Sequence, residues 1–411
     1  MRRLAAITCA LWLLAALPAE AQPGDAGLRR ELAASMRLAG PAAGAYVVDQ
    51  RGERVLFDWR AGVRRILASN TKIFTTAAAL DRLGPEGRFA TRVLGSGSLA
   101  GGGAWRGDLY LRGGGDPTFG SGPFVRRAYG SGATVEALAA ELEASGLTEI
   151  RGRVLGDEEL FDDLRGGPDS GYRVSRDVGP LSALAFNRGL ANERGSAFQA
   201  EPAAFAAARL DAALERRGIP VRGRPREGVV PPAAGELAEV ESPTVARLVQ
   251  ITNKRSDNLF AETLLKRLTA TAGQAGTTAG GAGAASAFAR ELGARTRLAD
   301  GSGLSRANRA SPRDVATALS RLRERDLFPA FNESLPIAGR DGTLRDRMRF
   351  GPARGRCRAK TGTLRDVSTL SGYCSTAGST VVFSILMNRV GTTGARRLQD
   401  RMVNAIARRR G

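Results

Sequence analysis

The stretch Ser69-Asn70-Thr71-Lys72 opens the segment from which the fold is most readily inferred. Apolar residues recur on one helical face between Asn70 and Leu83, and Gly84 supplies a stop, so a helix is predicted there. Ser69 and Lys72 are three residues apart, which lets the hydroxyl and the ammonium meet on one face. Free backbone N–H groups at a helix start favour negative charge, including that of an alkoxide. Taken alone, the tetrapeptide could equally be a capping serine and a surface lysine.

Lysine is rare in this chain, so a lysine at position 72 suggests a role that arginine cannot fill. Only four of the 61 lysines and arginines are lysines, and the 411 residues contain no histidine. A desolvated lysine can lose its proton and act as a base, whereas arginine effectively cannot. The lack of histidine excludes a Ser-His-Asp triad, a Cys-His pair and a histidine-ligated zinc. We expect no cofactor and no metal, and Lys72 is the best candidate for activating a nucleophile.

Two further short motifs follow along the chain. Ser256-Asp257-Asn258 lies between two predicted helices, and Lys360-Thr361-Gly362 lies at the end of a predicted strand. Each has an ordinary alternative explanation, a capping cluster for the first and an edge-strand lysine with a turn glycine for the second. Together with Ser69-x-x-Lys72, in this order and in these contexts, they form the set found in penicillin-binding proteins and class A β-lactamases.

This set of motifs predicts acyl transfer. Ser69 would attack a peptide carbonyl, and Lys72 would take its proton. Ser256 would relay that proton toward the leaving amine. Asn258 would hold a substrate amide through both its donor and its acceptor.

The third motif supplies charge and shape to the predicted site. Lys360 would lower the pKa of the base and attract an anionic end of the substrate. Thr361 would hydrogen-bond that carboxylate, and Gly362 would let the substrate backbone lie against the strand. The backbone N–H groups of Ser69 and Thr363 would form an oxyanion hole.

The start of the chain is typical of a secretory signal peptide. Arg2 and Arg3 precede an apolar run from Leu4 to Leu17, which is too short for a bilayer span of ~20 residues. Small residues at Ala19 and Ala21 then suit a signal peptidase. We expect cleavage after Ala21, a periplasmic or secreted location, and no transmembrane segment in the mature chain. An uncleaved anchor is the alternative.

The mature chain keeps two cysteines, Cys357 and Cys374, which can form a disulfide in an oxidising compartment. Their midpoint falls between Arg365 and Asp366, where a turn is expected. A symmetric hairpin centred there would place the cysteines opposite each other on neighbouring strands. Two buried free thiols are the alternative.

The chain is strongly basic, with a formal charge of +20. Such a charge suits anionic envelope polymers or lipid headgroups, but it can also reflect arginine spread over the surface. Nucleic acid is disfavoured by export and by the lack of a basic block interleaved with aromatic residues. The basic segment Arg396–Arg410 suits either a membrane-surface helix or a domain helix packed on a sheet, and we favour the second.

Both ends of the chain predict one α/β domain. Gly44–Asp49 and Arg54–Trp59 predict a hairpin, and the last strands are expected at Arg356–Lys360, Ser368–Cys374 and Ser379–Asn388. The middle of the chain alternates Gly-rich turns with short strand-like runs and predicts an insertion. The expected division is a signal peptide at 1–21, a catalytic domain at 22–87 and 241–411, and an insertion at 88–240.

The motifs and the long insertion resemble the D-alanyl-D-alanine carboxypeptidases/endopeptidases of the low-molecular-mass class C penicillin-binding proteins. Further similar stretches are Leu109–Pro117, Asp300–Arg306, Leu335–Gly339 and Asp341–Leu344. The resemblance implies an α/β transpeptidase/β-lactamase-like domain, an antiparallel sheet with helices, and two smaller domains inserted into it. It also implies a serine-type D-Ala-D-Ala carboxypeptidase that acts on peptidoglycan stem peptides and is inhibited covalently by β-lactams.

The same resemblance implies that an acidic residue of the insertion and an arginine near the Gly-Leu-Ser-Arg stretch bind the stem peptide. Asp157 and Arg306 are the matching residues. Lys266, on an ordinary predicted helix outside the motifs, is expected to tolerate replacement by arginine.

Several alternatives stay open on the sequence alone. Carboxypeptidase and D,D-endopeptidase activity are not distinguished, because both cleave a D-Ala–D-X bond. A β-lactamase is disfavoured, since the Glu-x-x-Leu-Asn pattern of class A enzymes is absent between the first two motifs. A non-enzymatic basic envelope-binding protein is disfavoured because the motifs are intact.

Overall fold

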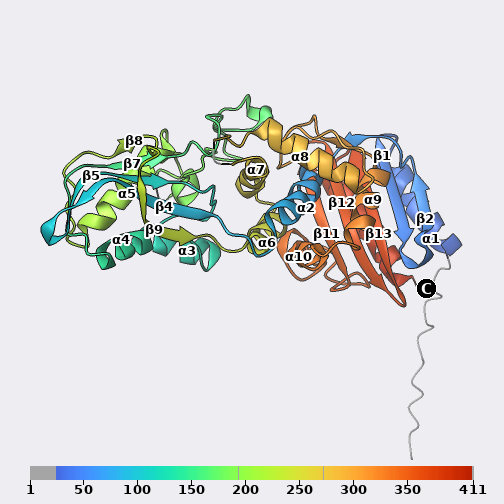
Figure 1. Ribbon diagram of the computed structural model, residues 1–411. Coiled ribbons are helices and arrows are strands. Elements are labelled where there is room, and N and C mark those ends of the chain that lie inside the picture. Colours follow the sequence, from blue (N-terminus) through green and yellow to red (C-terminus); the bar gives the residue numbers. More distant parts are fainter. Residues whose placement is uncertain (1–24, 193, 272, 410–411) are drawn as a thin grey trace, which may run out of the picture.

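The computed structural model describes residues 25–409 except 193 and 272, so the predicted signal peptide lies outside the described residues. The molecule is elongated and has two bodies (Figure 1). Both ends of the chain form one of them, the terminal body, which comprises residues 25–89 and 242–409. The middle body comprises residues 90–241.

The terminal body is built on a five-stranded antiparallel sheet in the order β11-β12-β13-β1-β2. The strands are β1 (Ala43–Asp49), β2 (Arg54–Trp59), β11 (Cys357–Leu364), β12 (Val367–Thr376) and β13 (Ser379–Asn388). The predicted N-terminal hairpin and the three predicted C-terminal strands all form. The pairing of β1 with β13 joins these two parts of the chain into one sheet.

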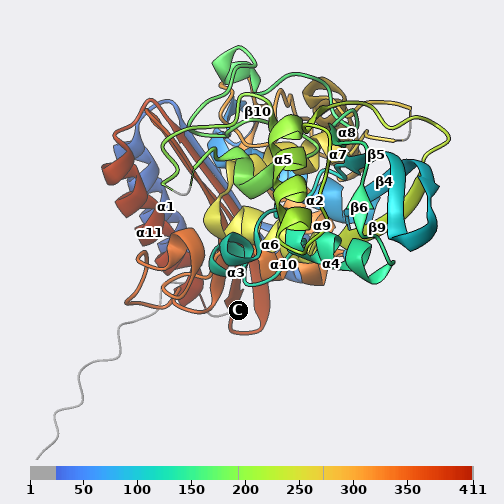
Figure 2. The same cartoon turned by 90° about the vertical axis from the view of Figure 1, so that its left-hand side faces the viewer.

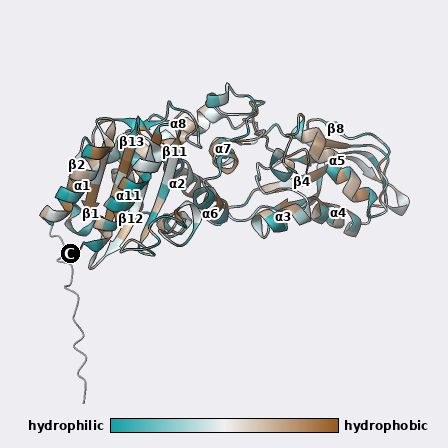
Figure 3. Cartoon of the chain, turned by 180° about the vertical axis from the view of Figure 1, so that it is seen from behind, coloured by the Kyte–Doolittle hydropathy of each residue, from teal (hydrophilic) through white to brown (hydrophobic). Residues whose placement is uncertain are grey.

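The terminal sheet separates two apolar cores because successive strand residues face opposite sides. Val381, Phe383 and Ile385 of β13 pack toward α1 (Asp25–Ala39) and α11 (Thr392–Arg408). Val382 and Leu386 pack toward the helices of the other face. These helices are α2 (Thr71–Leu83), α6 (Val245–Arg255), α7 (Asn258–Arg267), α8 (Thr278–Glu291), α9 (Pro312–Leu322) and α10 (Phe328–Ser334). Figure 3 shows hydrophobic colour along strands of this sheet.

The basic C-terminal helix packs within the terminal body, as the favoured interpretation predicted. Met402, Val403 and Ile406 of α11 are buried against the sheet and α1. Arg408 forms an ion pair with Glu31 of α1 at 2.8 Å. Across the described residues, no helix combines the length and the apolar character needed to cross a bilayer.

The middle body contains a six-stranded mixed sheet. Its strands are β4 (Ala90–Leu99), β5 (Ala104–Arg112), β6 (Glu149–Ile150), β7 (Val154–Asp157), β8 (Arg226–Glu227) and β9 (Gly235–Glu241). The helices α4 (Val135–Ala144) and α5 (Pro202–Glu215) share one apolar core with this sheet, and α3 (Gly122–Tyr129) lies next to α6 of the terminal body (Figure 1). Because β9 pairs antiparallel with β4, the chain leaves this body beside the point where it entered.

A long segment of the middle body, residues 158–201, is called here the connecting segment. Its described residues contain only short helical turns, at Pro168–Ser170 and Phe186–Gly189. The division of the insertion into two small domains stays a prediction. Figure 2 views the molecule from the side of the middle body and shows α4 and α5 in the same view as α2 and α6 behind them.

Candidate active site

The three sequence motifs converge at the end of the terminal body that faces the connecting segment. Ser69 lies in a 3-10 turn, Ala68–Asn70, directly before α2. Ala68 has a φ of 47°, which few residues other than glycine adopt. Such local strain is often found at functional sites, because the surrounding structure must hold it in place.

Lys72 is fully buried one turn after Ser69. Its Nζ lies 3.1 Å from Ser69 Oγ, 2.7 Å from Asn258 Oδ1 and 2.6 Å from the carbonyl oxygen of Ser302. The side chain of Asn258 also donates through Nδ2 to the carbonyl of Asp177 at 3.0 Å. Since a carbonyl can only accept, this contact fixes the orientation of the Asn258 amide.

These contacts suit a neutral amine at Lys72. The carbonyl of Ser302 and Oδ1 of Asn258 can only accept, so they take two N–H groups of Nζ. The remaining direction faces Ser69 Oγ, where the lone pair of a neutral amine can receive the hydroxyl proton. Burial lowers the pKa of Lys72 to about 8, although nearby carboxylates, with Glu262 foremost, act in the opposite direction. Lys72 can therefore lose its proton at a much lower pH than an ordinary lysine, which a general base requires.

Residues of the second and third motifs lie next to this pair, and of these Lys360 is fully buried. Lys360 Nζ donates to Ser256 Oγ and to the carbonyl of Thr361, both at 2.9 Å. Burial, and then the charge of Lys72, hold the pKa of Lys360 well below its usual value. Because Lys360 is the donor to Ser256, the hydroxyl proton of Ser256 is free to be donated to another group.

The strand β11 presents an edge to the site, because it is the outermost strand of its sheet. The N–H of Ala359 donates outward to the carbonyl of Pro336. Since N–H groups alternate along a strand, those of Thr361 and Thr363 point to the same outer edge. A Cβ at Gly362 would lie 2.8 Å from the backbone nitrogen of Ser69, so only glycine lets β11 approach the turn this closely.

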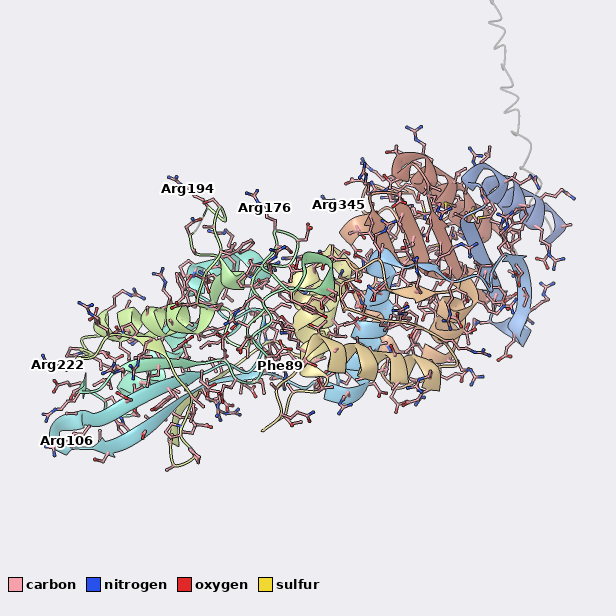
Figure 4. The ribbon with its side chains drawn as sticks, turned by 90° about the horizontal axis from the view of Figure 1, so that it is seen from above. Phe89, Arg106, Arg176, Arg194, Arg222 and Arg345 are labelled. Carbon is pink, nitrogen blue, oxygen red and sulfur yellow. A yellow bond between two sulfur atoms is a disulfide. The ribbon has the colours of Figure 1, made fainter. Side chains whose placement is uncertain are left out.

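A cavity of about 600 Å³ opens over these groups. It is lined by Ser69, Ser256, Asn258, Thr361, Gly362 and Thr363 together with Asp177, Thr343 and Arg396, among others. Thr343 hydrogen-bonds Thr361 through their hydroxyl oxygens at 2.7 Å, and Arg396 donates to Thr363 Oγ1 at 3.1 Å. In Figure 4, Arg176 of the connecting segment and Arg345 of the terminal body extend on the same side of the molecule.

A buried carboxyl group that sequence reasoning did not identify, that of Glu262, positions a hydrogen-bond partner of Lys72. Glu262, one helical turn after Asn258, accepts from the backbone N–H groups of Gly301 and Ser302. It thereby holds the loop whose Ser302 carbonyl meets Lys72. Burial raises the pKa of Glu262 to about 7. Its spacing of four residues from Asn258 is the only local signal that could have pointed to it.

Asp157 and Arg306, the two residues carried over from the family resemblance, do not line this cavity. Asp157 is buried in the middle body, where it accepts from Arg112 at 3.2 Å and from the backbone N–H of Val230 at 3.1 Å. Arg306 forms a bidentate pair with Asp366 at 2.8 and 3.2 Å. The structure gives each of them an internal partner, and each lines a different cavity.

Lys266 lies on a helix, as expected, but its surroundings argue against the expected tolerance of arginine. Its side chain is completely buried, and Nζ donates to Asp162 Oδ1 at 2.6 Å and to the carbonyl of Leu164 at 3.0 Å. Both partners belong to the connecting segment, which covers this face of α7. The sequence of α7 alone does not show that this face is buried, because the connecting segment that buries it comes from a distant part of the chain.

The hairpin that carries Lys360 has the predicted register. Arg365 and Asp366 form the turn, and Cys357 lies opposite Cys374. The structure joins these two cysteines in a disulfide. The bond lies at the end of the hairpin away from the turn and links β11 to β12.

The connecting segment also reaches the Ser256-Asp257-Asn258 motif through Arg188. Its guanidinium makes two hydrogen bonds to Asp257, at 2.8 and 3.1 Å, and lies over the ring of Phe260. Asp257 in turn caps α7 by accepting from the N–H of Phe260. Arg188 has a positive φ of 62°, so its backbone is held in an uncommon conformation by these contacts.

Comparison with known proteins places these features in context. A family described as the D-Ala-D-Ala carboxypeptidase 3 (S13) family matches residues 26–191 and 191–409. The chain is 29% identical to the D-alanyl-D-alanine carboxypeptidase of Actinomadura sp. (strain R39), over 96% of this chain and 88% of that protein. It is 30% identical to Carboxypeptidase DacB of Mycolicibacterium smegmatis, over 90% of this chain and 82% of that protein.

Solved structures show a similar fold. Penicillin binding protein 4 (dacB) from Haemophilus influenzae superposes with a TM-score of 0.77 at 21% identity, covering 90% of this chain and 97% of that one. A predatory peptidoglycan endopeptidase from Bdellovibrio bacteriovorus gives a TM-score of 0.51 at 20% identity, covering 84% and 86%. The expected α/β fold is thereby confirmed.

Proposed function

The chain belongs to the D-Ala-D-Ala carboxypeptidase 3 (S13) family of serine peptidases, and we propose that it hydrolyses D-Ala–D-X bonds of peptidoglycan stem peptides through an acyl-enzyme on Ser69. The observation that carries this proposal is the contact set of Lys72. A buried amine has two of its N–H groups taken by acceptors and its third direction aimed at Ser69 Oγ. This is the arrangement needed to deprotonate a serine without histidine.

In the acylation step, Ser69 Oγ bonds to the carbonyl carbon while its proton moves to Lys72 Nζ. The carbonyl oxygen becomes an oxyanion, which the backbone N–H groups of Ser69 and Thr363 would stabilise. When the C–N bond breaks, the leaving amine takes a proton from the Ser256 hydroxyl. Ser256 would recover its proton from Lys72, which returns the base to its neutral form.

In the deacylation step, water attacks the ester carbonyl and gives its proton to the same base, which releases the shortened peptide and Ser69. Lys360 and Thr361 would face the carboxylate at the end of the substrate. The exposed edge of β11 would pair with the substrate backbone as an added strand. Asn258 would keep the stem-peptide amide in line.

The substrate alternatives differ only in the leaving group. A free D-Ala makes the enzyme a carboxypeptidase, and a cross-linked diamino acid makes it a D,D-endopeptidase. Solved relatives include a penicillin G acylated endopeptidase and a penicillin-binding protein complexed with a β-lactam. We therefore propose that β-lactams acylate Ser69 here too, and that the enzyme works in the periplasm or outside the cell.

Intact-protein mass spectrometry after benzylpenicillin treatment tests the nucleophile. We expect one drug molecule per chain, a stable adduct rather than rapid nitrocefin turnover, and no adduct in Ser69→Ala. Persistent labelling of that variant would refute the assignment. Product analysis with a stem pentapeptide and with cross-linked muropeptides would then separate carboxypeptidase from endopeptidase activity, because only the former releases free D-Ala.

A further inference from the structure

A second cavity of the terminal body has an unusual charge. It has a volume of about 510 Å³ and lies where β3 (Arg65–Ile66) and β10 (Arg309–Ala310) meet the end of β13. Its lining includes five arginines and a single acidic residue: Arg64, Arg65, Arg306, Arg309, Arg389 and Asp366. None of these residues lines the catalytic cavity.

Two of the five arginines already have partners. Arg306 takes both carboxylate oxygens of Asp366. Arg65 is buried and donates to four backbone carbonyls at 2.6 to 3.0 Å. The lone acidic residue of the cavity is therefore fully used, and the charge of Arg65 is met only by carbonyl dipoles.

The other three arginines, Arg64, Arg309 and Arg389, make no side-chain hydrogen bond or ion pair with any residue that the structure describes. Burial, and then the charges of Arg306 and Arg297, lower the pKa of Arg309. The cavity thus gathers positive charge that the protein does not neutralise, and a bound anion would relieve this repulsion.

Arginine abundance in the chain does not account for this imbalance, because two larger cavities are balanced. The lining of the catalytic cavity contains two arginines, Arg347 and Arg396, and two aspartates, Asp177 and Asp346. The cavity between the two bodies has four arginines, which are matched by the same number of acidic residues. The excess of positive charge is specific to the cavity at β3 and β10.

We propose that this cavity binds a phosphate group. Three unpaired guanidiniums offer several parallel N–H pairs, which match the three terminal oxygens and the double charge of a phosphate ester. A carboxylate, with one charge and two oxygens, would occupy only one guanidinium fork. The phosphate can be a free phosphate monoester or the headgroup of phosphatidic acid, and both present three terminal oxygens to the cavity.

Isothermal titration of the whole mature protein with glycerol phosphate tests this site. In Arg64→Ala/Arg309→Ala/Arg389→Ala we expect the affinity to fall about tenfold or more. The matched control, Arg30→Ala/Arg37→Ala/Arg401→Ala, removes the same formal charge from exposed positions of α1 and α11 and should bind as the wild type does. Labelling by fluorescent penicillin should be unchanged in both variants, which verifies that they fold.

Vesicles identify the source of the phosphate. Co-sedimentation with vesicles that contain phosphatidic acid, lost in the cavity variant and retained in the control, would assign a lipid headgroup. Saturable binding of glycerol phosphate without binding to vesicles would assign a free phosphate ester. The proposal is overturned if the wild type shows no saturable phosphate binding, if acetate binds as tightly, or if both variants lose affinity equally.

Discussion

At Lys72 we expect a single choice of side chain to decide whether Ser69 can be activated. Arginine at this position would keep the charge but could not become neutral, and its planar fork does not fit three oxygen partners around one nitrogen. We expect Lys72→Arg to lose roughly 10²-fold or more in the rate of acylation by a fluorescent penicillin. Lys254→Arg is the matched control, because its ion pair with Asp341 is partly exposed and suits arginine. Near-normal acylation of Lys72→Arg would place the base elsewhere.

The pH dependence of acylation follows from the same residue. The pKa of Lys72 is lowered to about 8, so the neutral base predominates only above that pH. The acylation rate should therefore rise as pH increases through about 8 and then level off. Because Lys360 is nearby and also has a lowered pKa, the midpoint belongs to the pair. Stopped-flow acylation at a series of pH values measures it, and a rate that falls over this interval would contradict a lysine base.

At the scale of elements, a disulfide between Cys357 and Cys374 links the two strands of the hairpin β11–β12. The bond links the base of the strand that carries Lys360 and Thr361 to its neighbour. Thiol titration of the denatured, unreduced mature protein should find no free thiol. Two free thiols per chain would mean that the cysteines are merely adjacent and reduced.

The connecting segment is the second element on which the site depends. Arg188 holds Asp257, which stands between Ser256 and Asn258, so we expect Arg188→Ala to slow acylation about tenfold. Arg188→Lys should recover part of the rate, since it keeps one charged donor. Arg173→Ala, an exposed change in the same segment, is the control. An unchanged acylation rate in Arg188→Ala would limit this ion pair to a role in stability.

At the scale of the whole molecule, the two bodies meet along α7, which lies between them in Figure 1. The buried Lys266 forms an ion pair with the partly exposed Asp162 across this contact. The larger guanidinium of Lys266→Arg would not fit the closed space, and Lys266→Met would leave Asp162 unpaired, so each should cost about 1–3 kcal/mol of local stability. Hydrogen exchange should show lost protection in residues 158–165 of both variants, whereas wild-type protection would contradict the importance of the pair.

The sequence by itself determined the features that depend on local spacing. Ser69 and Lys72 meet because they are three residues apart at a helix start, and Cys357 faces Cys374 because the turn lies midway between them. Only the tertiary structure decided which distant residues reach the site. It brought Asp177 and Arg188 to the second motif, whereas Asp157 and Arg306 found other partners. Contacts of this kind depend on how the two bodies pack against each other, and neither helical nor strand periodicity carries that information.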